Sequence, residues 1–217
     1  MKMLVVFQKK GPMRLIGHLD LQRAMQRALR RSGLPAAYSQ GFSPHLLLSF
    51  AAPLSVGITG EREIMEVPLQ EETGEEAFLN RLNAVLPENL KALRARALPF
   101  DHPAAMARLF AAQYLIQPDS DMEQLLACLP GFLSQKTIPY LRRTKSGERM
   151  DDMRPMVYNL IPREDGLLAT LALQERGTAK PEALMEALAG FAGLPAPHCF
   201  ITRMMLLDER FAPLEDA

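Results

Sequence analysis

The chain has 217 residues, which fits one large domain or two small ones, and its 48% hydrophobic and 23% charged content is typical of a folded globular protein rather than a disordered one. Its formal net charge is zero, so the chain as a whole has no long-range attraction to nucleic acid or to an anionic membrane. The two cysteines, Cys128 and Cys199, lie far apart in the sequence, which excludes a disulfide framework and a cysteine-based metal site.

The charges are sorted along the chain. Among residues 1–50 every charged residue except Asp20 is basic, whereas acidic residues dominate residues 51–90. This pattern predicts one basic face and one acidic face. The N-terminal apolar run is too short for a signal peptide, and no stretch approaches the roughly 18 apolar residues of a membrane-spanning helix. We therefore expect a cytoplasmic protein that contacts no membrane.

The first half predicts the order strand, helix, two strands, helix, strand. A short β-rich run ends in a Lys-Lys-Gly-Pro turn, and apolar residues then recur at helical spacing until Gly33. Thr73 and Glu76 form a capping box that opens the second helix. The expected elements are a strand at 3–8, a helix at 18–32, strands at 46–50 and 62–69, a helix at 73–86 and an edge strand at 90–98.

A similar order starts again after the Pro-rich linker at 99–103. Residues 151–159 are ambiguous, and the other expected elements are strands at 108–117, 137–143, 167–174 and 199–207 and helices at 121–133 and 180–191. The sequence thus predicts an α+β protein of two tandem ferredoxin-like (βαββαβ) modules with antiparallel sheets, over residues 1–100 and 104–217.

The clearest candidate binding residues lie on the first helix. Arg23, Arg27, Arg30 and Arg31 are three or four residues apart, so they share the face opposite the apolar stripe. A solvated helix surface is the simpler explanation, but such a surface normally carries acidic residues at i±4, and this helix has only Asp20. Guanidinium groups bind phosphate oxygens, which favours nucleic acid.

The loop that follows, Tyr-Ser-Gln-Gly-Phe-Ser-Pro-His at 38–45, offers several groups to a ligand. Gly41 can adopt positive φ, Gln40 carries an amide, and the ring of Phe42 can stack on a base. The alternative is a packed connection in which Tyr38 and Phe42 fill the core and His45 begins a strand.

His18 at the start of the first helix can act as a general base or a phosphate contact, although such a residue more often helps to cap the helix. Arg14 lies just before it and adds to the basic candidates.

In the second half, basic residues surround a Lys-Ser-Gly turn and suggest a hairpin that grips a sugar-phosphate backbone, although exposed edge strands carry such residues too. The RNA-binding candidates of this segment are Arg142, Arg143, Lys145 and Arg154. Asp151 and Asp152 are adjacent, and because adjacent strand residues point to opposite faces they do not suggest a shared metal. The sequence contains no glycine-rich nucleotide-binding fingerprint, so we expect no cofactor.

Three motifs carry a resemblance to a known family. The His-Leu-Asp-Leu sequence at 18–21, the arginine block at 27–31 and Ser-Gln-Gly-Phe with Pro-His at 39–45 resemble the bacterial radical SAM-linked proteins, a family defined by a domain of unknown function. Asp152 with the Arg-Pro at 154–155 resembles a second motif of that family. The chain differs from the family pattern at Gly17, where a serine is usual, and at Leu47, where a lysine is frequent. The resemblance implies as partner a radical SAM protein with a predicted cobalamin-binding region.

These observations leave three hypotheses for function. The first is a non-catalytic accessory module that presents RNA, such as tRNA or rRNA, to a separate radical SAM modification enzyme. The second is a metal-independent endoribonuclease similar to the repeat-processing proteins of CRISPR systems, with His18 or His45 as the base. The third is a protein-interaction scaffold that docks the radical SAM partner through the acidic residues between Glu61 and Glu76.

Overall fold

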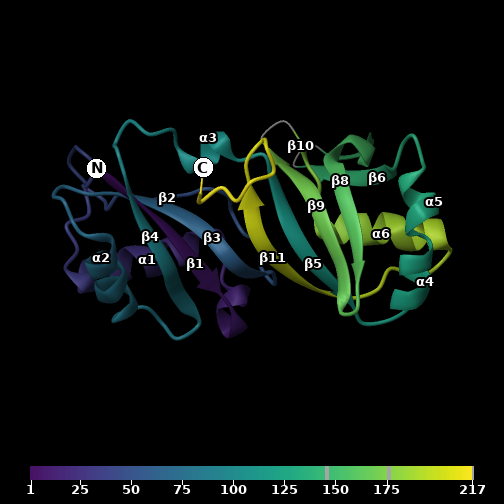
Figure 1. The fold of residues 1–217 in the computed structure, drawn as a ribbon, viewed down its shortest axis with the longest axis horizontal. Coiled ribbons are helices and arrows are strands. Elements are labelled where there is room, and N and C mark those ends of the chain that lie inside the picture. Colours follow the sequence, from purple (N-terminus) through teal and green to yellow (C-terminus); the bar gives the residue numbers. More distant parts are fainter. Residues whose placement is uncertain (145–146, 175–176, 217) are drawn as a thin grey trace. The chain divides into compact units, whose positions relative to one another are not determined.

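The computed structural model describes residues 1–144, 147–174 and 177–216 (Figure 1). The protein is of the α+β class, with mostly antiparallel strand pairs and few helices. The chain divides into two compact units, one made of Met1–Leu109 with Arg203–Ala217 and the other of Phe110–Thr202. The C-terminal segment, which the sequence pattern assigns to the second module, therefore packs with the first unit.

The sheet of the first unit is built around its N-terminal strand. β1 (Lys2–Lys9) pairs antiparallel with β3 (Thr59–Pro68) on one side and with β4 (Leu90–Leu98) on the other, where the sheet ends. The exposed and buried residues of β4 interleave as expected for an edge strand. The apolar run at 46–50 forms only the two-residue strand β2 (Ser49–Phe50), which pairs with β3.

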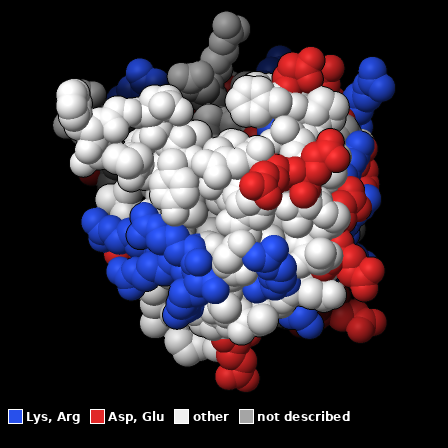
Figure 2. Space-filling view, turned by 90° about the vertical axis from the view of Figure 1, so that its left-hand side faces the viewer, with Lys and Arg blue, Asp and Glu red and all other residues white. Residues whose placement is uncertain are grey.

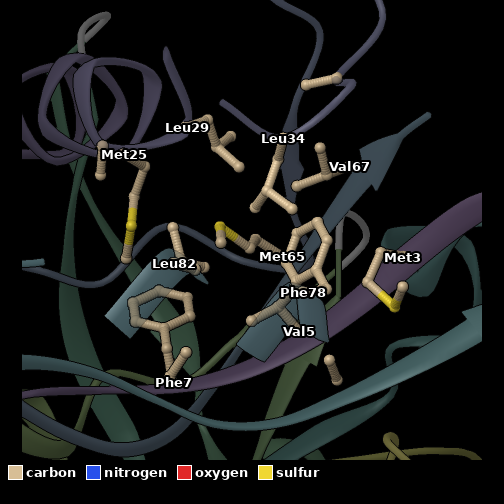
Figure 3. Packing of buried hydrophobic residues seen from close by; sticks show 14 of the residues in the cluster. Met3, Val5, Phe7, Met25, Leu29, Leu34, Met65, Val67, Phe78 and Leu82 are labelled. Atoms are coloured by element: carbon tan, nitrogen blue, oxygen red, sulfur yellow. The ribbon is translucent and has the colours of Figure 1, made fainter. Parts of the chain in front are cut away.

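Two helices cover one face of this sheet, α1 (His18–Ser32) and α2 (Glu75–Asn83). Alternate residues of β1 point toward them, because successive side chains of a strand face opposite sides. Figure 3 shows the resulting core, in which side chains of α1 and α2 meet those of β1 and β3. Its labelled members are Met3, Val5, Phe7, Met25, Leu29, Leu34, Met65, Val67, Phe78 and Leu82.

The capping box predicted for α2 is wrong. The helix begins after Gly74, and no side chain caps its first turn. Glu75 instead accepts a hydrogen bond from the backbone N–H of Ala97 at 2.8 Å, so the carboxylate joins the helix to β4. Thr73 lies one residue too early to serve as the N-cap. The remaining elements of this unit are the 3-10 helix η1 (Gly11–Leu15) and the short helix α3 (Ala105–Arg108), which the sequence did not predict.

The strands of the second unit pair antiparallel, and the hairpin of β6 and β7 forms a separate two-stranded sheet. The strand order is β10-β9-β5-β11, and β8 pairs with the edge of β9 that lies opposite β5. The helix predicted at 121–133 is wrong as a single element, because the helical hydrogen bonding is interrupted at Cys128, two residues before Pro130. The elements are β5 (Ala111–Pro118), α4 (Met122–Ala127), α5 (Leu129–Leu133), β6 (Pro139–Thr144), β7 (Gly147–Asp152), η2 (Arg154–Met156), β8 (Val157–Arg163), β9 (Gly166–Gln174), β10 (Gly177–Thr178) and α6 (Pro181–Ala192).

The last strand, β11 (Cys199–Leu207), runs from the second unit into the first. Its first four residues belong to the second unit and the remaining five to the first. The bounds predicted for this strand, 199–207, agree with the structure, as do those of α1 and β4.

Candidate functional site

The basic face of α1 is exposed as its spacing predicts. Leu21, Met25, Ala28 and Leu29 are buried and hold the helix on the sheet. On the opposite side three arginines project into solvent, and we call them the arginine crest: Arg23, Arg27 and Arg30.

Acidic residues neutralise little of the positive charge of the arginine crest. Arg23 forms an ion pair with Asp20 at 3.1 Å, but both side chains are 63% exposed. Exposed pairs of this kind contribute only about 0–1 kcal/mol, so a phosphate can readily compete for the guanidinium. Within the part of the chain that the structure describes, Arg27 and Arg30 make no ion pair.

Arg31 lies at the edge of the crest and binds protein instead. Its guanidinium donates to the backbone carbonyl of Val85 at 2.7 Å, just past the end of α2. Arg81 of α2 reciprocates by donating to the carbonyls of Ser32 and Gly33 at the end of α1. A cation beside the last carbonyls of a helix stabilises them, so these two arginines connect the C-terminal ends of both helices.

The loop at 38–45 is closed by a serine and a histidine. The backbone N–H of Ser39 donates to the carbonyl of His45 at 2.9 Å, and the Ser39 hydroxyl accepts from the His45 N–H at 3.0 Å. The same hydroxyl lies 2.8 Å from Nδ1 of the imidazole. Gly41 adopts a φ of 118°, and Phe42 beside it is fully exposed. The alternative in which Phe42 fills the core is therefore wrong, and Gln40 and His45 are exposed as well.

A side chain of α1 joins this loop to the crest. The amide of Gln26 donates to the backbone carbonyl of Leu46 at 3.1 Å, at the base of the loop. Gln26 lies three residues after Arg23 and four before Arg30, so these residues are neighbours along the helix surface. The structure thus brings together two predicted features, the basic helix face and the glycine loop. Gln26, which joins them, has no feature in the sequence that marks it as functional.

His18 occupies a different environment from the crest. Its ring packs edge-on against Phe50, with ring centroids 5.3 Å apart, and its Nδ1 atom is buried without a hydrogen-bond partner in the described structure. No side-chain cap is formed at the start of α1, where Gly17 is the N-cap. His18 therefore packs against the core at this point. Arg14 is half-buried in η1.

The basic hairpin of the second unit, β6 and β7, is partly neutralised. Asp151 forms ion pairs with Arg142 at 3.2 Å and with Arg149 at 3.4 Å. The hydrogen bond from Arg142 holds the pKa of the Asp151 carboxyl below its ordinary value. Arg143 belongs to β6, whereas Lys145 lies outside the described residues.

Asp152 and Arg154 have local structural contacts. The carboxylate of Asp152 accepts from the backbone N–H groups of Ile138 at 2.8 Å and Arg154 at 2.9 Å. The guanidinium of Arg154 donates to the carbonyl of Val157 at 3.2 Å. In the described residues no group of three or more His, Cys, Asp or Glu side chains is arranged to hold a metal ion.

Part of the acidic stretch after residue 60 forms ion pairs inside the first unit. Glu63 is buried and bound by Arg203 through two nitrogens, one of them Nε at 2.8 Å. Glu66 is buried in an ion pair with Lys2 at 2.9 Å. Lys9 is also buried and donates to the carbonyl of Ile16 at 3.0 Å; burial lowers the pKa of its ammonium, against the opposing effect of the Glu63 charge.

No helix in the described residues is long and apolar enough to cross a membrane.

A search of the curated proteins finds no match for this chain. A family model described as "uncharacterized protein conserved in bacteria" (DUF2344) matches residues 2–181, and that description names no radical SAM partner. Because the match spans most of the chain, the protein belongs to this conserved bacterial family.

Proposed function

We propose that the protein is a non-catalytic RNA-binding module, acting in the cytoplasm, that contacts RNA phosphates through the arginine crest. The observation that carries the proposal is the exposure of Arg27 and Arg30 without an acidic partner in the described structure, beside an Arg23 whose only ion pair is exposed. Guanidinium groups bind phosphate oxygens in a bidentate manner, and phosphate contacts supply most of the affinity of sequence-independent RNA binding.

The surroundings of the crest support a local electrostatic attraction even though the chain is neutral overall. Figure 2 views the side of the molecule where α1 and α2 lie in Figure 1, and it shows Lys and Arg side chains gathered there with few acidic ones among them. Arg81 adds a further exposed cation near the end of α1. A local basic patch of this kind can attract a polyanion without a net positive charge on the whole protein.

The finer architecture and the partner are part of the same proposal. The order β4-β1-β3-β2 in the first unit and β11-β5-β9-β8 in the second supports two ferredoxin-like modules, each with two helical segments between its strands. The partner that we propose is a radical SAM protein with a cobalamin-binding region, which modifies the bound RNA, a tRNA or rRNA. This part of the proposal rests on the sequence resemblance alone. Co-purification of such a protein with the tagged chain tests this part of the proposal.

The endoribonuclease hypothesis retains one candidate base. His45 is exposed and its Nδ1 is engaged by Ser39, so its Nε2 is the nitrogen available to a substrate hydroxyl. His18 is less suited, because its Nδ1 is buried against the core. Incubation of labelled RNA with the protein in the presence of a chelator separates the two functions: cleavage products that disappear in the His45→Ala variant would favour the nuclease.

The scaffold hypothesis has fewer exposed acidic side chains available for docking than the sequence suggests. Glu63 and Glu66 are buried in ion pairs with Arg203 and Lys2, so the exposed acids of this stretch are those at 71, 72, 75 and 76. A pull-down of partner proteins with and without nuclease treatment distinguishes a direct protein interaction from one that RNA mediates.

The direct test is an electrophoretic mobility shift with total bacterial RNA at about 50 and 200 mM salt. We expect binding at low salt that weakens strongly at high salt and is reduced when Arg23, Arg27 and Arg30 are replaced by glutamine. Absence of a shift at low salt would exclude the proposed function.

A further inference from the structure

Phe42 is more exposed than any other phenylalanine in the described residues. It is fully exposed, whereas Phe7, Phe78 and Phe132 are at most 1% exposed. Burial of a phenylalanine side chain contributes about 1.5–3 kcal/mol to folding, and Phe42 forgoes this contribution completely. Its exposure therefore adds nothing to the stability of the first unit but leaves both faces of the ring open to a ligand.

The loop that carries Phe42 is braced at its base. Hydrogen bonds of 2.8–3.0 Å between Ser39 and His45 close the loop. Next to them, the backbone N–H of Leu47 donates to the carbonyl of Ala37 at 2.8 Å. A ring held on a closed loop loses little conformational freedom when it binds, so more of the contact energy appears as affinity. Gly41 permits the positive φ next to the ring, a conformation that a residue with a Cβ rarely adopts.

The loop that carries the ring is joined at its base to the helix that carries the arginine crest. Gln26 of α1 holds the base of the loop through the carbonyl of Leu46, and Arg23 and Arg30 are its neighbours on the helix. A π face next to several phosphate-binding cations is the combination that proteins use to hold single-stranded nucleic acid, because the cations follow the backbone while bases stack on the aromatic ring.

We propose, as an extension of the RNA-binding function above, that this region selects RNA with unpaired nucleotides and stacks one base on Phe42. In an A-form duplex each base is already stacked within the helix, so a single exposed ring finds no free base face. In a single strand or a loop the base can turn outward onto the ring. Because every base has a π face, the site tolerates any sequence.

The test compares one RNA in two forms by fluorescence anisotropy. A fluorescein-labelled 12-nucleotide RNA is titrated with the full-length protein as a single strand, and again after annealing to its complement, in the same salt. We expect the single strand to bind about tenfold or more tightly than the duplex. Phe42→Ala should weaken single-strand binding about 5- to 150-fold and leave duplex binding unchanged. Phe42→Trp should retain the preference.

Two further variants separate stacking from other effects. Phe100 is also largely exposed, after β4, and Phe100→Ala serves as the matched control that should leave both affinities unchanged. Ser39→Ala removes the brace and should weaken single-strand binding less than Phe42→Ala does.

Equal binding of the two RNA forms, or no effect of Phe42→Ala, would overturn this inference. If the protein bound duplex RNA through the crest arginines alone, the proposed function would stand and the selection of unpaired nucleotides would be wrong. If neither RNA bound, both proposals would fall.

Discussion

Replacing the crest arginines tests the phosphate-binding role quantitatively. The triple variant Arg23→Gln, Arg27→Gln, Arg30→Gln keeps good helix formers on the exposed face of α1 and leaves its buried stripe intact. If each guanidinium neutralises one phosphate of a single-stranded RNA, the three together contribute about 2 to the slope of log affinity against log salt. A fourfold rise in salt, from about 50 to 200 mM, should then weaken the wild type about 20-fold more than the variant.

The assay is fluorescence anisotropy of a labelled single-stranded RNA at four salt concentrations, with circular dichroism to check the fold. A matched control removes three exposed cations elsewhere, in the variant Lys136→Gln, Arg163→Gln, Arg210→Gln, which has the same net charge. The control should keep the wild-type slope. The reasoning is refuted if the crest variant also keeps that slope, or if the control lowers it equally, because the attraction would then depend on net charge and not on the crest.

Three predictions concern stability and reactivity. Arg203→Met leaves the buried carboxylate of Glu63 without its guanidinium, so we expect a loss of about 3–5 kcal/mol in urea unfolding; a change below about 1 kcal/mol would show that the pair is dispensable. Gly60→Ala puts a Cβ 2.5 Å from Cγ of Glu63 and should cost about 1–3 kcal/mol in the same assay, whereas an unchanged midpoint would contradict this close packing. Burial raises the pKa of Cys199 to about 11, so in a Cys128→Ser background the rate of alkylation by iodoacetamide should still rise above pH 9, and a plateau there would be inconsistent with the burial.

The elements that the sequence predicted best are those with strong local signals. The bounds of α1 follow from its apolar spacing and from Gly33, which adopts a φ of 65° at the helix end. Other elements depended on distant partners. The apolar run at 46–50 reads as a strand, yet only Ser49 and Phe50 pair with β3. The helix at 121–133 breaks at Cys128, although its apolar spacing continues past the break.

The charge pattern was visible in the sequence, but the ion pairs that these charges form in the fold were not. The basic first segment and the acidic second one predicted one basic face and one acidic face. In the fold β1 and β3 are neighbours, so Lys2 pairs with Glu66 inside the first unit, and Lys10 at the end of β1 pairs with Glu61 at 2.8 Å. Such long-range pairing cannot be seen from composition, because it depends on strand order. The crest arginines were predictable because helical spacing alone determines their shared face.

The residues of the candidate site that sequence analysis missed act through the backbone. Gln26 holds the carbonyl of Leu46, Ser39 closes the loop with His45, and Arg81 caps α1. The contacts of Gln26 and Arg81 have no local sequence signature, because each joins residues 20 or more positions apart in the sequence. The exposure of Phe42 was equally undecided in the sequence, where a buried ring and a presented ring have the same pattern.

The central claim, that the crest and the neighbouring loop form an RNA-binding surface, is tested most directly by ultraviolet crosslinking of the full-length protein to cellular RNA. Mass spectrometry of the digested complex then identifies the peptides that carry nucleotides. We expect crosslinked nucleotides on peptides from residues 18–46, which contain α1 and the Phe42 loop. Crosslinks confined to residues 110–202, or no crosslinked RNA at all, would contradict the claim.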